Sequence, residues 1–227
     1  MNIKTFRMNE CIHAEGLVVV IDVIRAFTTA AFAFASGVEK IFVTRTVDEA
    51  LSLHAKFPHT RTMGEVDGFA IQQFNYGNSP LQFKDENLTG ITLIQRTSSG
   101  TQGIINCIHA QQILAASFVV AEATLKYIRF LQPAQLSLVV TGPDNADEDL
   151  AFADYLSARL NHHNVSPRSY LERVKNSPSG KKALLDPLNG RCSFEDLQAV
   201  LQVNRFPFFM EVLKEKEHFV LKAFPEL

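Results

Sequence analysis

Two acidic residues lie near the ends of predicted strands, in positions where a carboxylate could take part in chemistry. Asp22 follows the apolar stretch of LVVVIDV (17–23), and Glu65 lies near the end of TRTMGEV (60–66). A buried carboxylate without a partner is costly, so Asp22 needs either a counter-ion or a function. Because Mg²⁺ prefers oxygen ligands and shares phosphate oxygens, both residues are candidates for metal ligand or general base. The structural alternative for Asp22 is a salt bridge to Arg25.

The segment LIQRTSSGTQG (93–103) has the composition of an anion-binding loop. It leads from an apolar strand into a predicted helix, whose first backbone N–H groups and dipole favour negative charge. Glycine lets the backbone approach a ligand closely, and arginine can fork onto a phosphate or carboxylate. The alternative is an ordinary helix start, capped by Ser99 or Thr101. The predicted phosphate-binding residues in this segment are Arg96, Thr97, Ser98, Ser99, Gly100 and Thr101.

Three further segments carry polar residues that could join such a site. IDVIRAFTTA (21–30) adds an arginine and threonines, and GNSP (77–80) reads as a tight turn. The acidic residues of 147–149 begin a predicted helix, where most acids simply complement the helix dipole. The candidates added here are Arg25 as a catalytic residue, Thr28, Asn78 and Ser79 as substrate ligands, and Glu148 and Asp149 as metal ligands.

Composition excludes several classes of protein. The chain has 227 residues and a formal net charge of −2, which argues against a nucleic-acid partner. No apolar run reaches the roughly 18–20 residues of a membrane span, and the N-terminus lacks a secretory apolar stretch. The three cysteines have no CxxC spacing, which favours a reducing, cytoplasmic setting. A small-molecule partner is expected, with a homodimer as a candidate assembly.

Strand-like and helix-like segments alternate along most of the chain, which predicts an α/β protein with a largely parallel or mixed central sheet in α/β/α layers. The last third differs, with two helical patterns and then HFVLKAF (218–224) as a closing edge strand. We expect a single domain over 1–227, with a helical C-terminal part that could form a second lobe from about 142 to 227. Ligands of such folds bind at the carboxyl ends of strands. The loops 22–29, 64–80, 95–101 and 141–149 should therefore meet.

Taken in order, these segments resemble the 2-phosphosulfolactate phosphatase family. The matching stretches are IDVIRAFTT (21–29), GE (64–65), FNYGNSP (74–80), TSSGT (97–101) and ED (148–149). The resemblance implies an α/β fold and a Mg²⁺-dependent phosphatase that acts on a small phosphorylated organic acid. The reaction it implies converts 2-phosphosulfolactate to sulfolactate and phosphate.

The chain also departs from the family pattern. Val66 stands where the family has an arginine, Phe27 replaces a threonine, and Val119 and Val120 replace an asparagine. These departures support an alternative, a non-catalytic anion- or phosphometabolite-binding protein of the same fold.

Other phosphatase chemistries lack their motifs. No cysteine has an arginine six positions on, no second aspartate follows Asp22 at 24, and no zinc spacing occurs. Metal-assisted attack by water is what remains. Arg25 and Arg96, if both face the site, would bind a second anionic group on the substrate.

Overall fold

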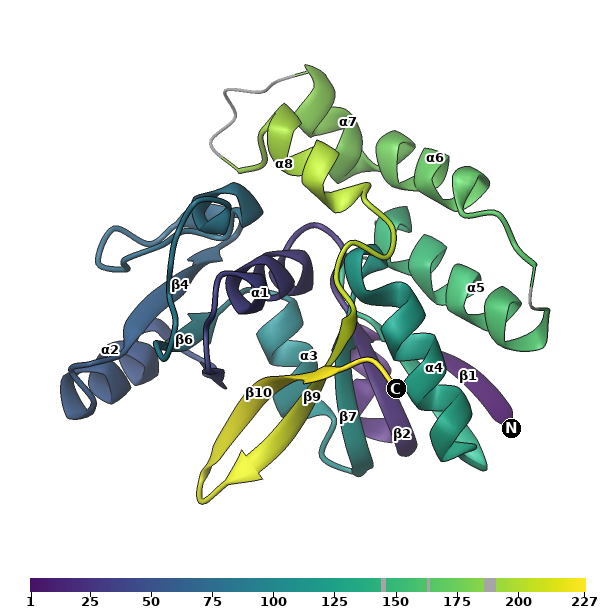
Figure 1. The fold of residues 1–227 in the computed structure, drawn as a ribbon, viewed down its shortest axis with the longest axis horizontal. Helices are drawn as coiled ribbons and strands as arrows, with labels where there is room; N and C mark the ends of the chain where they lie inside the picture. Colours follow the sequence, from purple (N-terminus) through teal and green to yellow (C-terminus); the bar gives the residue numbers. More distant parts are fainter. Residues whose placement is uncertain (144–145, 163, 186–190) are drawn as a thin grey trace.

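The protein is described by a computed structural model over residues 1–143, 146–162, 164–185 and 191–227. The strands within these residues form one mixed sheet in the order β1-β8-β2-β7-β9-β10-β3-β6-β4-β5 (Figure 1). The strands are β1 (Asn2–Arg7), β2 (Gly16–Ile21), β3 (Lys40–Val43), β4 (Arg61–Val66), β5 (Phe69–Ala70), β6 (Thr92–Arg96), β7 (Ala110–Ala116), β8 (Gln135–Val140), β9 (Phe208–Glu215) and β10 (His218–Pro225).

Helices connect these strands, and the predicted layered α/β class with a mixed sheet is confirmed. The α-helices are α1 (Ala26–Ala35), α2 (Val47–Lys56), α3 (Gly100–Asn106), α4 (Ala121–Leu131), α5 (Asp147–Asn161), α6 (Arg168–Asn176), α7 (Pro178–Leu185) and α8 (Phe194–Val200). Short 3₁₀ helices occur at η1 (Met8–His13), η2 (Pro80–Phe83) and η3 (Phe118–Val120). None of the helices in the described ranges is long and apolar enough to cross a membrane.

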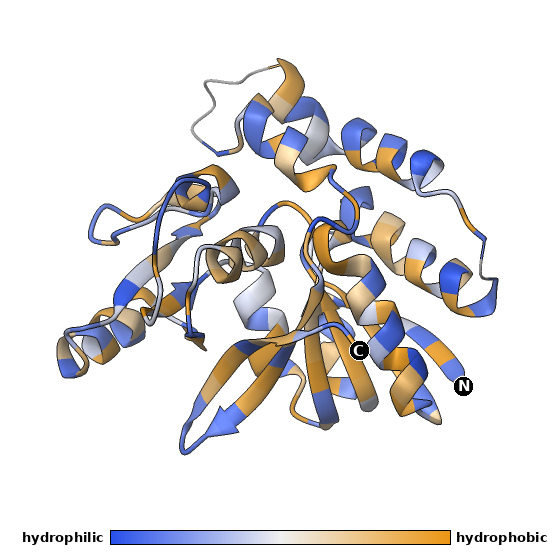
Figure 2. Ribbon diagram, in the orientation of Figure 1, coloured by the Kyte–Doolittle hydropathy of each residue, from blue (hydrophilic) through white to orange (hydrophobic). Residues whose placement is uncertain are grey.

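Strand β2 shows why the sequence folds in this way. It pairs in parallel with β7 on one side and β8 on the other, so its backbone groups are satisfied within the sheet. Leu17 to Ile21 are buried on both faces of the strand, as the unbroken apolar run predicts. Figure 2 shows the same hydrophobic colouring along the neighbouring strands. Asp22 follows at the carboxyl end of this strand.

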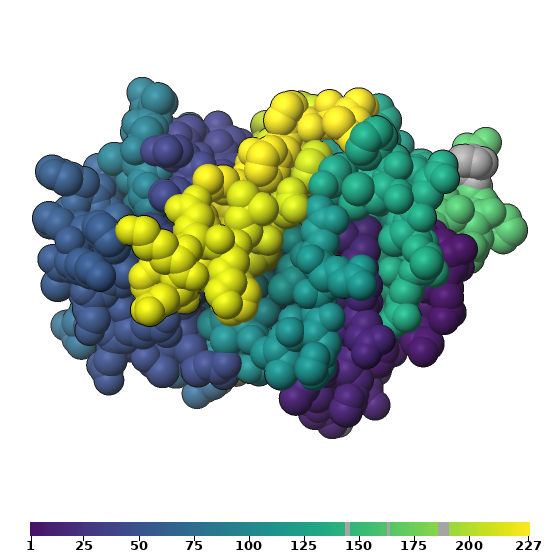
Figure 3. Space-filling model, turned by 90° about the horizontal axis from the view of Figure 1, so that it is seen from below, coloured from purple at the N-terminus to yellow at the C-terminus, as the bar shows by residue number. Residues whose placement is uncertain are grey.

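The C-terminal hairpin corrects one expectation. HFVLKAF was predicted as an edge strand, and this is wrong, because β10 lies inside the sheet between β9 and β3. β10 is antiparallel to both neighbours, and β9 is antiparallel to β7. The hairpin therefore joins a wing with β1, β8, β2 and β7 to a wing with β3, β6, β4 and β5. In Figure 3 it is the yellow segment between the blue and teal parts of the chain.

Two helices connect the two wings. Helix α3 contacts β2 in one wing and β3 in the other, and α1 contacts α3 and β7. Strands that are far apart in the strand order therefore lie against the same helix, which brings their ends toward one site. Helices α5 to α8 stack in succession beyond β8, and α8 contacts η2. The expectation of one domain or a second lobe from about 142 stays a prediction.

Candidate active site

The polar loops predicted to meet do line a common cavity of about 530 Å³. It lies at the carboxyl ends of β2, β4, β6 and β8, where ligands of parallel sheets bind. The predicted site residues that line it are Asp22, Arg25, Glu65, Asn78, Ser98, Ser99, Glu148 and Asp149.

Asp22 and Asp149 tie two of these loops together. The carboxylate of Asp22 accepts the backbone N–H of Ala26 at 2.9 Å. Asp149 accepts the N–H of Val23 on one oxygen at 2.7 Å and that of Gly142 on the other at 2.9 Å. Both oxygens of Asp149 are therefore engaged in bracing the loops after β2 and β8.

Glu65 has the same bracing role in the other wing. Its Oε1 accepts the backbone N–H of Ser98 at 2.5 Å, and its Oε2 accepts the N–H of Gly68 and, at 3.3 Å, the hydroxyl of Ser98. Arg96 donates to the carbonyl oxygen of Glu65 at 2.6 Å and to Ser98 Oγ at 3.2 Å. Arg96 therefore fixes the loop. It was expected to bind phosphate, but it does not line the cavity.

The loop 97–101 is built differently from the predicted phosphate cradle. Thr97 and Thr101 each accept the other's backbone N–H through their hydroxyl groups, at 3.0 and 2.9 Å. Ser99 holds the cap position of α3, but its side chain makes no capping hydrogen bond. The Ser98 N–H donates to Glu65, and Gly100 lies close to Asp22, since an added Cβ there would be 2.9 Å from Oδ2 of Asp22. This loop therefore packs against two carboxylates of the site.

The clustering of carboxylates raises two pKa values. Burial, with the charges of Glu65 and Glu148, raises the pKa of Asp22 to about 6. Burial, with the charges of Asp22 and Glu148, also raises the pKa of Asp149 well above its usual value. Oε2 of Glu148 is buried and has no hydrogen-bond partner in the described structure. These carboxylates repel one another, and one buried oxygen lacks a hydrogen-bond partner. A bound cation would stabilise both features of the site.

This donor set suits a hard divalent cation. Carboxylate oxygens are the ligands that Mg²⁺ prefers. Within the described residues no group of three or more His, Cys, Asp or Glu side chains converges closely enough to hold an ion by itself. Mg²⁺ does not require a complete protein cage, because it is usually held by one or two carboxylates together with waters and substrate phosphate. Asp22 and Glu148 are the carboxylates with oxygens to spare.

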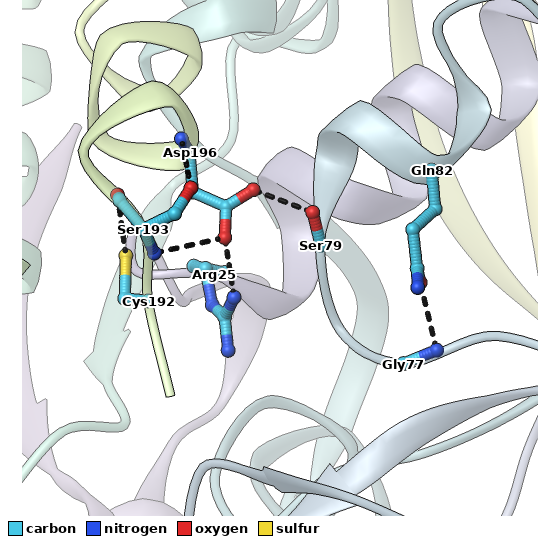
Figure 4. Close-up of polar contacts among 7 residues, drawn as sticks. All are labelled: Arg25, Gly77, Ser79, Gln82, Cys192, Ser193 and Asp196. Atoms are coloured by element: carbon cyan, nitrogen blue, oxygen red, sulfur yellow. Dashed lines mark hydrogen bonds and ion pairs between the residues drawn. The ribbon is translucent and has the colours of Figure 1, made fainter. Parts of the chain in front are cut away.

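Arg25 is held by a residue that the sequence did not point to. Its Nη1 lies 2.6 Å from Oδ2 of Asp196, and both side chains are buried. Ser79 donates to Oδ1 of the same aspartate at 2.5 Å, so α8 is joined to the loops after β2 and before η2 (Figure 4). The alternative salt bridge between Asp22 and Arg25 is not the one formed among the described residues.

One predicted ligand lies outside the cavity, and several residues that were not predicted line it. Thr28 is buried in α1 and donates to the carbonyl of Val23 at 2.9 Å, so the structure gives it a place in the core. The cavity also receives residues that carried no motif in the sequence. The main ones are Asp67, Ser179, Lys182, Arg191 and Cys192.

The departures from the family pattern fall in two environments. Phe27, Val119 and Val120 are fully buried, so they serve the core around α1 and η3. Val66 ends β4 and is 37% exposed. An arginine at 66 would extend from the exposed end of the strand next to Glu65.

Gly100 supports a test of this geometry. A Cβ there would lie 2.8 Å from the Cβ of Ala26 and 2.9 Å from Oδ2 of Asp22. We expect Gly100→Ala to lower the free energy of unfolding by about 1–3 kcal/mol, because neither helix backbone can yield easily. The matched control is Gly77→Ala, whose Cβ would meet its nearest atoms at 3.4 Å, an ordinary contact. Urea denaturation measures both, and equal stability of Gly100→Ala and wild type would contradict the close approach.

Comparison with known proteins gives a consistent result. A family model described as 2-phosphosulpholactate phosphatase matches residues 5–204. A Bacillus subtilis protein, "Probable 2-phosphosulfolactate phosphatase", is 33% identical over 167 residues, covering 72% of this chain and 73% of its own. A Carboxydothermus hydrogenoformans protein of the same description is 35% identical over 148 residues, covering 64% and 61%. One from Thermotoga maritima is 31% identical over 164 residues, covering 70% and 71%.

Proposed function

Because the chain belongs to the 2-phosphosulfolactate phosphatase family, whose members are phosphoric monoester hydrolases, we propose that it is a Mg²⁺-dependent phosphatase of small phosphorylated organic acids. The first candidate substrate is 2-phosphosulfolactate, which would yield sulfolactate and phosphate. The observation that carries the proposal is the cluster of Asp22, Glu65, Glu148 and Asp149 on one cavity, with a buried oxygen of Glu148 left unpartnered.

Asp22 and Glu148 are the residues we propose to hold Mg²⁺. Glu65 and Asp149 have both oxygens in hydrogen bonds to the backbone, so their proposed role is to fix the loops that carry the other two. When bound, Mg²⁺ supplies polarisation of the phosphoryl oxygens and activation of water. This division narrows the four predicted metal ligands to two.

The remaining residues bind and orient the substrate in this proposal. Arg25 presents a buried positive charge to the cavity, held in place by Asp196. A guanidinium fixed in advance binds phosphoryl oxygens at little entropic cost and stabilises charge that develops on them. Ser98 and Ser99 add polar groups at the opposite wall of the cavity.

The proposed setting is the cytoplasm. Cys11, Cys107 and Cys192 are buried and form no disulfide within the described residues, which fits a reducing compartment. We also propose that the protein has no nucleic-acid partner, because its formal net charge is −2. A homodimer is the proposed assembly.

Release of phosphate tests the function. We expect the protein to release inorganic phosphate from 2-phosphosulfolactate in Mg²⁺, at a kcat within the roughly 1–10³ s⁻¹ of ordinary enzymes. The control reaction contains the Asp22→Asn variant, which reports any contaminating phosphatase. Binding of the substrate by calorimetry without release of phosphate would favour the alternative, a non-catalytic phosphometabolite-binding protein.

A further inference from the structure

A second, smaller cavity of about 250 Å³ adjoins the first. Arg25, Asn78 and Arg191 line both cavities and so mark the junction between them. Beyond the junction, the second cavity is walled by the turn before η2 and the start of α8, including Gly77, Ser79 and Asp196.

The two cavities differ in charge. Among the described residues that line the first, five are acidic and three are basic. Among those that line the second, Asp196 is the one acid, against Arg25 and Arg191. The carboxylate of Asp196 is already engaged, by Arg25 at 2.6 Å, by the N–H of Ser193 at 3.2 Å and by Ser79 at 2.5 Å. The second cavity therefore has an excess of positive charge, whereas the first has an excess of negative charge.

Arg191 is held at this junction by contacts with Phe69 and Gly68. Its guanidinium lies 4.7 Å from the ring centre of Phe69, an arrangement in which the ring face attracts the cation. Its stem packs on Gly68, where an added Cβ would lie 3.0 Å from the Cγ and Cδ of the arginine. An arginine restrained in this way loses little rotamer entropy when it binds a ligand.

These observations extend the proposed function and rest on it. We propose that the second cavity binds the carboxylate or sulfonate of a 2-phospho acid, and that Arg191 is the residue that sets the preference for such substrates. The phosphoryl group then lies toward the acidic cavity, at Asp22 and Glu148, and the second anionic group lies toward Arg191. Arg25, at the junction, neutralises charge on both.

The test compares two phosphoesters that differ in one group. 2-Phospholactate carries a carboxylate, and isopropyl phosphate has a methyl group in its place. A hydrogen bond to a charged group contributes enough for roughly a tenfold to 150-fold effect. In Arg191→Met the ratio of kcat/KM for 2-phospholactate to that for isopropyl phosphate should therefore fall at least about tenfold. Arg191→Lys, which keeps the charge without the fork, should recover part of the ratio.

Arg205→Met is the matched control, since Arg205 also lies over an aromatic ring, at 5.9 Å from Phe206, but is exposed and absent from both cavity walls. Its ratio should equal that of wild type. An unchanged ratio in a folded Arg191→Met protein would overturn the inference while leaving the phosphatase proposal intact. If wild type hydrolysed neither of these esters nor 2-phosphosulfolactate, the proposed function would fail. Calorimetry would then still decide the inference. The ratio of the affinities for the two esters should be about tenfold lower in Arg191→Met than in wild type.

Discussion

Asp22→Asn is expected to lower kcat by roughly 10³-fold and, in metal-free protein, to raise the melting temperature. The loss of activity follows because asparagine removes one of the two carboxylates proposed to hold Mg²⁺. The gain in stability follows because burial, together with the charges of Glu65 and Glu148, disfavours the Asp22 carboxylate and raises its pKa to about 6. Active sites commonly combine function with local destabilisation in this way.

The raised pKa of Asp22 also makes the stability of the folded protein depend on pH. Burial raises the pKa of Asp22 from 3.8 in the unfolded chain to about 6 in the folded protein. Between these values the unfolded state binds fewer protons, so the free energy of unfolding falls as pH rises and stays lower above about pH 6. The cost at neutral pH is roughly 3 kcal/mol. The neutral amide avoids it, and about 1–3 kcal/mol of gain corresponds to roughly 2–10 °C.

Scanning calorimetry in a chelator at pH 5 and pH 7.5, together with phosphate-release assays in Mg²⁺, measures both effects. Asp147→Asn is the matched control, because Asp147 is an acidic residue next to Glu148 in sequence but does not line the cavity. Asp147 pairs with Arg173 at 2.6 Å, which lowers its pKa, so its loss should reduce stability slightly and leave kcat unchanged. Wild-type turnover in Asp22→Asn would remove Asp22 from the site.

Mg²⁺ should raise the melting temperature of the wild-type protein by about 5–10 °C at a concentration near 100 times its dissociation constant. A ligand that binds only the folded state stabilises it by mass action, and here it also relieves the repulsion among the carboxylates. Glu148→Gln should lose most of the increase, because Oε2 of Glu148 is the buried oxygen without a partner. NaCl at matched ionic strength is the control. An equal increase in Glu148→Gln, or none in wild type, would contradict the two-carboxylate site.

Much of the site could be predicted because strand ends are marked locally in the sequence. Asp22 and Glu65 follow apolar strands, and parallel strands bring such ends to one edge of the sheet. The polar loops around them were recognised for the same reason. The role of the loop 97–101 could not be predicted in the same way. Its composition shows that it carries hydrogen-bond donors, but not which groups accept from them. The N–H of Ser98 donates to Glu65, and Gly100 packs closely against Asp22.

The contribution of the C-terminal third could not be predicted in the same way. Asp196 lies 171 residues from Arg25 along the chain, and an acid in the first turn of a helix reads as a dipole complement. The pattern of HFVLKAF indicates a strand, but not that it pairs on both sides. Long-range pairing of this kind leaves no local signal, so Arg191 and the second cavity emerge only from the fold.

Phosphate release from 2-phosphosulfolactate, followed as Mg²⁺ is restored to chelated protein, tests the central claim most directly. Turnover should be absent in the chelator and should return with Mg²⁺ in wild type. In Asp22→Asn and Glu148→Gln it should stay at least about 10²-fold lower at the same Mg²⁺ concentration. Full turnover after exhaustive chelation would contradict the claim that these carboxylates form a metal-dependent phosphatase site.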